Sequence, residues 1–377
     1  MSGLLPKERL KRMAKGQDID RAASVGGWMH SITNLSTIAG INIDEYMSDP
    51  LSGVIKANRA LGVDAMVPPI VPQELDQIRS GYLQEETFKD VEPEALLERA
   101  NHIPDTADEI LAVKFDAAKT ESDYHEKWEY FIKHFGNIVF LPVHWEAEAD
   151  FSLYFQYGYE AFLAAIALYP NAIERIFWED SILARARNQI LIKLYREYDI
   201  PPILFCGHDI CINTGPMCSP DFLRNHYWKH AKYSLEPLVE SGIRIIGHCD
   251  GNVMPVIDDM VKAGFSGFQG FQYEYGVDPW IMERKRSMLG EKLLYLAGLS
   301  ITRTLPYGTV SDVIEEVEYC LDYSDRGQRL LLFPSNVIGP EVPYENIKAG
   351  YRYIHEGRYD AGKMLSERQW PWSSKRK

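Results

Sequence analysis

Residues 244–252 read Arg244-Ile245-Ile246-Gly247-His248-Cys249-Asp250-Gly251-Asn252. A short apolar, β-branched run ends here in histidine, cysteine, aspartate and glycine, which is typical of a buried parallel strand that carries polar groups at its carboxyl end. The next segment, 253–263, has apolar residues at helical spacing, and Gly264 predicts its end. Residues 265–269 predict another strand. This is one strand–helix repeat, and in such repeats ligands bind where the strands end.

The same order of strand, polar turn and helix recurs along the chain. Further apolar runs predict strands at 63–69, 137–143, 202–206, 293–298 and 330–333. Roughly six to eight units result, about the number that a (β/α)8 barrel needs. We therefore predict an α/β fold, a distorted (β/α)8 TIM-type barrel, with a doubly wound open sheet as the alternative. A single domain is expected over 1–377, with an N-terminal helical extension at 1–60, the barrel at 61–360 and a tail at 361–377.

Composition and motifs exclude several functional classes. The net charge of −14 argues against a nucleic-acid partner, because phosphate binding needs a basic face. No run of about 18 apolar residues predicts a membrane span. The first residues lack the apolar core of a signal peptide, so a cytoplasmic location is expected. The five cysteines form no Cys-x-x-Cys pair, which excludes a zinc ribbon, and no Gly-x-Gly-x-x-Gly follows a first strand, which argues against dinucleotide binding.

Polar side chains cluster where the predicted strands end, and a barrel would gather them at one rim. His248 and Asp250 lie two residues apart, so in an extended segment both side chains point the same way and can reach one ligand or metal. His144 and Glu146 have the same spacing. The structural alternatives are that Asp250 caps the next helix, that His248 bonds a backbone carbonyl, and that Asp209 is a turn residue. Cys249 should face the opposite way and pack.

The rim residues divide into three predicted roles. The predicted catalytic residues are His248, Asp250, His208, Asp209 and Glu146. The predicted substrate-binding residues are His144, Gln269, Gln272, Tyr273, Ser335, Asn336 and Asp64, with packing as the alternative for Tyr273. The predicted metal ligands are His248, Asp250 and Glu146. Histidine and carboxylate groups gathered at strand ends indicate a metal or acid–base site.

Several motifs, in order, resemble the uroporphyrinogen decarboxylase superfamily over most of the chain. They are Lys7-Glu8-Arg9-Leu10, Leu61-Gly62-Val63-Asp64-Ala65, Gly207-His208-Asp209, Thr214-Gly215-Pro216-Met217-Cys218-Ser219-Pro220, His248-Cys249-Asp250-Gly251-Asn252-Val253, Thr304-Leu305-Pro306-Tyr307-Gly308-Thr309 and Pro343-Tyr344-Glu345-Asn346-Ile347. The resemblance implies a distorted (β/α)8 barrel. It leaves two reaction types open, because the superfamily holds both decarboxylases and corrinoid-dependent methyltransferases.

The chain resembles the methyltransferase branch more than the true decarboxylases. The decarboxylases carry an Arg-Gln-Ala-Gly-Arg pattern near the N-terminus, where this chain has Gly26-Gly27-Trp28-Met29-His30. An acidic chain without that basic motif is a poor host for a polyanion. The thiol-methylating members bind zinc through a His-x-Cys pair and a distant Cys. Here His248 matches, Asp250 replaces the second ligand, and Ser335-Asn336 occupies the last-strand region.

That departure informs the expected chemistry. Thiolate ligands suit a zinc that activates a thiol, whereas a set of His, Asp and Glu is harder and suits an oxygen-bearing substrate. The resemblance therefore implies methyl transfer from a methoxylated aromatic donor to a corrinoid carried by a partner protein, with zinc as a Lewis acid. A homodimer is also expected. The alternatives are a decarboxylase of a small substrate, a thiol methyltransferase and a non-enzymatic ligand-binding barrel.

Overall fold

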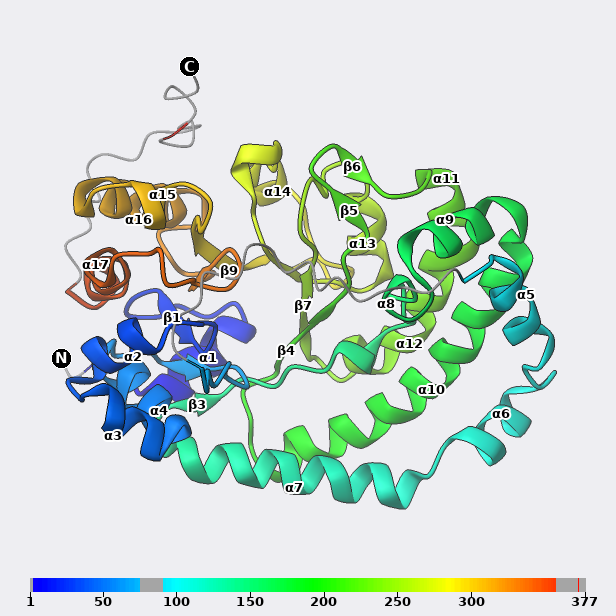
Figure 1. Ribbon diagram of the computed structural model, residues 1–377, viewed down its shortest axis with the longest axis horizontal. Helices are drawn as coiled ribbons and strands as arrows, with labels where there is room; N and C mark the ends of the chain where they lie inside the picture. Colours follow the sequence, from blue (N-terminus) through cyan, green and yellow to red (C-terminus); the bar gives the residue numbers. More distant parts are fainter. Residues whose placement is uncertain (1–2, 75–90, 357–371, 373–377) are drawn as a thin grey trace.

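Eight parallel strands form the centre of the molecule in the computed structural model, which describes residues 3–74, 91–356 and 372 (Figure 1). In chain order the strands are β1 (Ala23–Gly26), β2 (Ala65–Met66), β3 (Val139–Phe140), β4 (Ile203–Gly207), β7 (Arg244–His248), β8 (Gly267–Gln269), β9 (Leu294–Leu299) and β10 (Leu330–Pro334). They pair in the order β3-β2-β1-β10-β9-β8-β7-β4. Every neighbouring pair in this sheet is parallel.

The sheet closes on itself just beyond β3. A parallel bridge joins Val143 to Phe205 of β4, and the N–H of His144 donates to the Phe205 carbonyl at 3.0 Å. With that bridge the order around the ring equals the order along the chain, which is the topology of a (β/α)8 barrel. Since β2 and β3 have only two residues each, few backbone hydrogen bonds close the barrel on this side. The predicted distorted barrel is confirmed.

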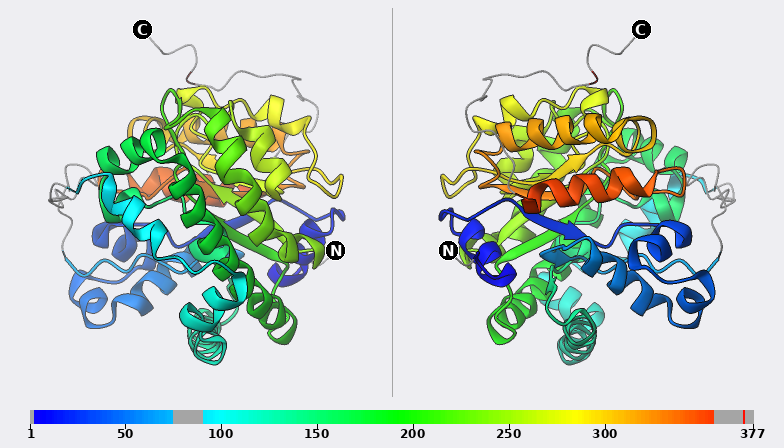
Figure 2. Two further views of the ribbon diagram at one scale, coloured as in Figure 1. Left: turned by 90° about the vertical axis from the view of Figure 1, so that its right-hand side faces the viewer. Right: turned by 90° about the vertical axis from the view of Figure 1, so that its left-hand side faces the viewer.

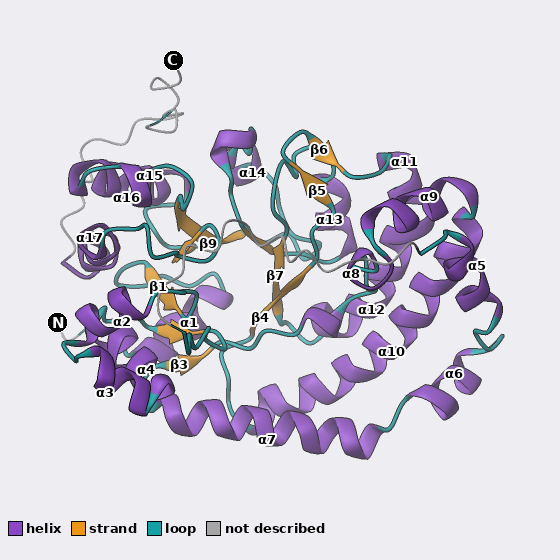
Figure 3. Ribbon diagram, viewed as in Figure 1, coloured by secondary structure: helices purple, strands orange, loops and turns teal. Residues whose placement is uncertain are grey.

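Helices surround the strands (Figure 3). They are α1 (Pro6–Ala14), α2 (Ile32–Ala39), α3 (Ile43–Ser48), α4 (Pro50–Ala60), α5 (Glu94–Asn101), α6 (Ala107–Lys114), α7 (Ala117–Phe135), α8 (Tyr154–Tyr157), α9 (Tyr159–Leu168), α10 (Pro170–Glu197), α11 (Pro220–Phe222), α12 (Trp228–Glu240), α13 (Ile257–Ala263), α14 (Pro279–Glu283), α15 (Thr304–Tyr307), α16 (Val310–Tyr323) and α17 (Tyr344–Glu356). Figure 2 shows α10 beside α12 on one side and α16 beside α17 on the other. None of the described helices has the length and apolarity that a membrane crossing requires.

The strands separate two apolar cores, because successive side chains of a strand point to opposite faces. Phe205, Ile246 and Phe333 belong to the smaller core inside the barrel, which Leu10 and Met13 of α1 join. The residues that alternate with them, such as Leu204, Ile245 and Leu332, pack in the larger core beneath the helices. A side chain just beyond the carboxyl end of a strand points to the open end of the barrel when it lies an even number of residues from an inward-facing residue. It points to the helical layer when that number is odd.

The predicted boundary at residue 61 is wrong for the barrel. Strand β1 lies inside the segment 1–60 that was expected to be a helical extension, and it pairs with β2 on one side and β10 on the other. Its sequence, Ala23-Ser24-Val25-Gly26, holds a single β-branched residue, so it lacked the apolar run that marks the other strands. The predicted tail at 361–377 lies outside the described residues except for Trp372.

Candidate active site

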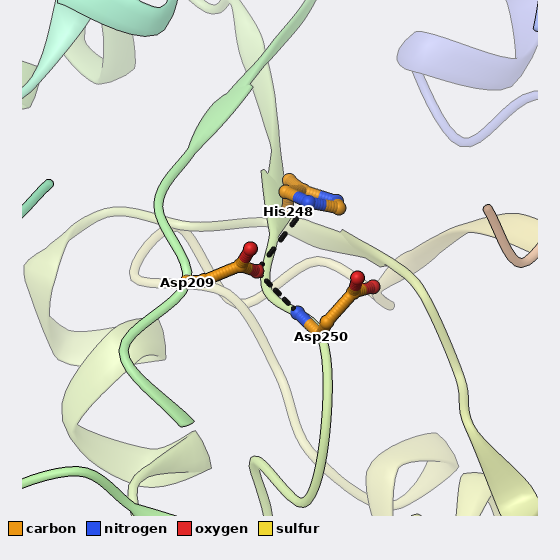
Figure 4. Close-up of side chains that lie close together, drawn as sticks. All are labelled: Asp209, His248 and Asp250. Carbon is orange, nitrogen blue, oxygen red and sulfur yellow. Dashed lines mark hydrogen bonds and ion pairs between the residues drawn. The ribbon is translucent and has the colours of Figure 1, made fainter. Parts of the chain in front are cut away.

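Asp209, His248 and Asp250 meet at the carboxyl ends of β4 and β7 (Figure 4). One donor atom from each lies within 4.8 Å of the others. The Nε2 atom of His248 is 3.5 Å from Oδ1 of Asp209, and the same carboxylate oxygen accepts the backbone N–H of Asp250 at 2.8 Å. We call these three residues the carboxylate–histidine trio. Their convergence agrees with the predicted i, i+2 pairing of His248 and Asp250.

Strand alternation places His248 at the mouth of the barrel. It follows Ile246, which points into the barrel, by two residues, so its imidazole continues the inward face of β7. Gly207 of β4 lies against the His248 backbone with φ +131°, and a Cβ there would approach the His248 backbone nitrogen to 2.4 Å. This close approach requires glycine, and it brings Asp209 beside the imidazole.

Gln269 of β8 orients the His248 ring. The two residues are register partners on adjacent strands, and His248 Nδ1 lies 2.5 Å from the Gln269 Oε1 atom. The amide nitrogen of Gln269 donates to the carbonyl oxygens of Pro334 and Ser335, so its oxygen faces the imidazole. Nδ1–H therefore donates, which leaves Nε2 directed at Asp209. Burial alone would lower the pKa of His248, but the carboxylates of Asp209 and Asp250 outweigh it and raise that pKa.

Asp250 carries an oxygen without a partner. Its Oδ2 atom accepts the amide N–H of Asn336 at 2.6 Å. Its Oδ1 atom is buried, and no donor of residues 3–74 or 91–356 bonds it. Burial raises the pKa of Asp250 to about 6, with the nearby Asp209 charge acting in the same direction and His248 opposing it. A buried carboxylate oxygen left open is costly unless a ligand satisfies it.

The trio has the donor set of a metal site. One imidazole and two carboxylates are ligands that zinc accepts, and the open Asp250 oxygen points to a missing partner. Zinc, predicted from the sequence, therefore fits this arrangement. Glu146, predicted as a metal ligand, lies outside this group, whose third member is Asp209.

Glu146 and His144 form a separate cluster on the outer side of the barrel. His144 is buried and lies an even number of residues after Phe140, which faces the helical layer, so its ring points toward α7. There Trp128 donates its indole N–H to His144 Nε2 at 3.2 Å, and His144 Nδ1 lies 3.1 Å from Glu146. Tyr124 donates to the same Glu146 oxygen at 2.8 Å. The expected catalytic role of Glu146 and substrate contact of His144 are not supported, because both serve packing against α7.

His208 lies in a second acidic cluster, with Glu148 and Asp150, two carboxylates that were not predicted as site residues. Its Nε2 atom is buried, 3.9 Å from Glu148, and its Nδ1 atom is 3.6 Å from Asp150. Glu148 accepts the hydroxyl of Tyr227 at 3.3 Å. Burial lowers the pKa of His208 and raises that of Glu148 to about 8. The alternation of Glu146, Glu148 and Asp150 after a strand was the available pattern for finding the two missed carboxylates.

Glu148→Gln should change how stability depends on pH. The folded protein keeps the Glu148 proton up to a pKa of about 8, whereas the unfolded chain releases it near its ordinary value, so wild-type stability falls as pH rises through this window. The variant has no proton to release. Its free energy of unfolding should equal that of the wild type near pH 5 and exceed it by about 2–4 kcal/mol near pH 8.5.

Urea denaturation at both pH values measures this difference. Glu160→Gln, an exposed substitution on α9, is the matched control and should run parallel to the wild type. Parallel profiles for Glu148→Gln and the wild type would contradict a buried, protonated Glu148.

Asp64 lies at the opposite end of the barrel from the trio. It precedes β2, and its carboxylate bonds Arg9 at 2.5 Å and Arg21 at 2.8 Å. It also accepts the backbone N–H of Ser24 at 3.0 Å. The prediction of Asp64 as a substrate-binding residue is therefore wrong, because it stands at the amino end of its strand, where it joins α1 to the barrel.

The other predicted substrate-binding residues either hold the trio and its neighbouring loops in place or pack in the core. Asn336 and Gln269 touch the trio as described above, and Gln272 accepts the N–H of Gly251 at 2.5 Å, which holds the loop after Asp250. Ser335 accepts the N–H of Ile301 at 3.2 Å and supports a neighbouring loop. Tyr273 is buried against Tyr323, with 3.0 Å between their hydroxyl oxygens, which agrees with the packing alternative.

Cys249 faces away from the trio. Its thiol is buried and accepts the backbone N–H of Ile210 at 3.4 Å. A hydrogen bond with Cys211, together with burial, raises the pKa of this thiol well above its usual range. A thiolate ligand at this position is therefore disfavoured.

Comparisons with known proteins agree with this architecture. Residues 213–357, which include the His248–Asp250 segment, match the family model described as uroporphyrinogen decarboxylase (URO-D). The fold is similar to that of a solved structure described as a methyltransferase from Methanosarcina mazei, with a TM-score of 0.58, 16% sequence identity, and coverage of 94% of this chain and 99% of that chain. No curated protein sequence matches the chain significantly. The family match over residues 213–357 and the barrel fold agree with the predicted resemblance to the uroporphyrinogen decarboxylase superfamily.

Proposed function

We propose that this protein transfers a methyl group from a methoxylated aromatic donor to the cobalt of a corrinoid held by a partner protein. The carboxylate–histidine trio, with its open Asp250 oxygen, is the observation that carries the proposal. The fold likeness to a methyltransferase supports the reaction class. The hard donor set favours an ether oxygen over a thiol as the atom that loses the methyl group.

Asp209, His248 and Asp250 are the residues that would hold zinc. Bound there, zinc would act as a Lewis acid on the ether oxygen and make the phenolate a better leaving group. Gln269 holds the His248 ring with Nε2 toward Asp209, and Asn336 holds the Asp250 carboxylate. These supporting bonds keep the ligand atoms in place before the substrate arrives.

His208 and Glu148 would serve the departing oxygen. Glu148 keeps its proton at neutral pH because burial raises its pKa to about 8. His208 directly precedes Asp209 in the chain, and its buried Nε2 atom lies 3.9 Å from Glu148. We infer that Glu148 holds a proton beside His208. His208 would donate a proton to the phenolate oxygen as the methyl group leaves, and Glu148 would then reprotonate His208.

A decarboxylase of a small carboxylated substrate is the alternative, supported by the description of the matching family model. The charge of the site argues against it. Within residues 3–74 and 91–356, the side chains outside the trio that hydrogen-bond to it are the amides of Gln269 and Asn336, and no lysine or arginine bonds it. A carboxylated substrate is expected to need such a cation. Release of carbon dioxide without any corrinoid protein would favour this alternative.

Metal content and methyl transfer test the proposal. Elemental analysis of zinc-supplemented protein should find about one zinc per chain, lost in Asp250→Ala and retained in Glu146→Ala, because only Asp250 belongs to the donor set. The wild-type protein should then methylate a corrinoid protein with 2-methoxyphenol as donor. Absence of zinc from the wild type would contradict the Lewis-acid role. Loss of zinc in Glu146→Ala would contradict the assignment of ligands. The expected homodimer stays a prediction.

A further inference from the structure

Two indole rings lie beside His248 and have no part in the proposed metal site. Trp28 follows β1, and Trp145 follows the segment that closes the barrel at β3. The ring centroids of Trp28 and Trp145 are 5.9 Å and 5.6 Å from that of His248, and both indoles meet the imidazole edge to face. The two indoles are 6.4 Å apart. Segments separated by more than a hundred residues thus bring two tryptophans to one face of the candidate site.

These indoles separate the barrel core from the mouth. Trp28 contacts Phe205 and Phe333 at 5.6 Å and 5.2 Å, and Trp145 contacts Phe205 at 5.2 Å. Both phenylalanines are fully buried in the inner core. Trp145 is 39% exposed, and Trp28 is half-buried. The inner core therefore ends in an indole wall that is partly open to solvent next to the trio.

An exposed tryptophan at this place needs a reason. Aromatic side chains contribute most when both faces are covered, and a half-exposed indole beside polar ligands leaves apolar area uncovered. Flat aromatic ligands cover such area and gain from offset or edge-to-face contacts. The alternative occupant of an aromatic wall is a methylated ammonium cation.

The net charge of the trio with its metal distinguishes a neutral aromatic ligand from a methylated ammonium cation. Two carboxylates and a neutral imidazole around a dication carry no net charge, so the loaded trio attracts neither an anion nor a cation. The remaining attraction is the stacking of a neutral ring. An ether oxygen on that ring then lies beside the trio, because the indoles contact the His248 ring directly.

We propose that Trp28 and Trp145 form the specificity wall of the site, on which the aromatic ring of a neutral methyl donor stacks with its ether oxygen toward the trio. This inference rests on the proposed function and names the residues that select the donor. It predicts that the chain prefers aromatic ethers over aliphatic ethers and over quaternary ammonium compounds.

Calorimetric binding of 2-methoxyphenol to zinc-loaded protein, with no corrinoid protein present, tests the wall apart from the reaction. Trp145→Leu should weaken binding about fivefold to tenfold, and Trp145→Phe should stay within about threefold, because phenylalanine keeps an aromatic face. Trp178→Phe, on α10 and away from the trio, is the matched control and should bind as the wild type does. Thermal melting of each variant verifies that it folds.

The outcomes separate the two proposals. Binding of the ether that Trp145→Leu weakens, without any methyl transfer to a corrinoid protein, would keep the wall and overturn the proposed reaction. Equal binding by Trp145→Leu and the wild type, no binding by the wild type, or tighter binding of tetramethylammonium than of 2-methoxyphenol would each overturn the wall.

Discussion

Asp64→Ala is expected to lower the free energy of unfolding by about 3–5 kcal/mol, because it removes one of the two acidic partners of a buried arginine together with the carboxylate that Arg21 and Ser24 share. Arg9 is 2% exposed, and its Nη1 atom bonds Asp64 at 2.5 Å. Asp20 also bonds Arg9, at 2.8 Å and 2.9 Å, so one of its two acidic partners remains. Arg21 and the backbone N–H of Ser24 lose the same carboxylate. The expected loss of stability is large because the Asp64 carboxylate accepts hydrogen bonds from Arg9, Arg21 and Ser24 at once.

Urea denaturation measures this loss, and Asp199→Ala provides the control. Asp199 also bonds two cations, Lys7 and Lys11, but it is 67% exposed. Removal of this exposed pair should change stability by less than about 1 kcal/mol. The folded fraction of Asp64→Ala should keep the wild-type rate of methyl transfer, because Asp64 is at the far end of the barrel. A slower rate in fully folded protein would restore the substrate-binding role that the sequence suggested.

His248→Ala is expected to lower the rate of the proposed methyl transfer by about 10²–10⁴-fold, the range for loss of a central acid–base or ligand group. His248 joins every other part of the site. It faces Asp209 through Nε2 and Gln269 through Nδ1, and it contacts both indoles. No neighbouring side chain can replace it, because the residues around it are carboxylates, amides and aromatic rings.

Single-turnover methylation of the corrinoid protein measures this rate, with zinc content determined on the same samples. His102→Ala is the matched control, since His102 is exposed on the far end of α5 and bonds a carbonyl of its own helix. It should leave both rate and zinc unchanged. A His248→Ala variant that keeps its zinc and most of its rate would exclude the trio as the site of reaction.

Local sequence patterns predicted most strands of the barrel. The apolar runs at β4, β7, β9 and β10 marked strands, and the polar residues after them marked the rim. The spacing of His248 and Asp250 correctly predicted that both point to one site, because the alternation of a strand is a local property. Strand β1 was missed, since two small residues and a glycine stand where other strands have branched ones.

Local sequence patterns could not predict which face of a strand points into the barrel. His144 and Glu146 have the spacing of His248 and Asp250 and do meet each other, but on the outer side against Trp128. The parity of a residue relative to the barrel axis depends on the register of neighbouring strands, which is non-local. For the same reason Asp209 entered the donor set and Glu146 did not.

By itself, the sequence determined the strand–helix repeat, the resemblance to the uroporphyrinogen decarboxylase superfamily and the presence of His248 and Asp250 at a strand end. The tertiary structure decided the rest: that Asp64 joins α1 to the barrel, that Asn336 and Gln269 hold the side chains of Asp250 and His248, and that two distant tryptophans flank His248. Periodicity reports which residues share a face of one element. Closure of the barrel brings different elements together, and only closure determines which of those faces meet.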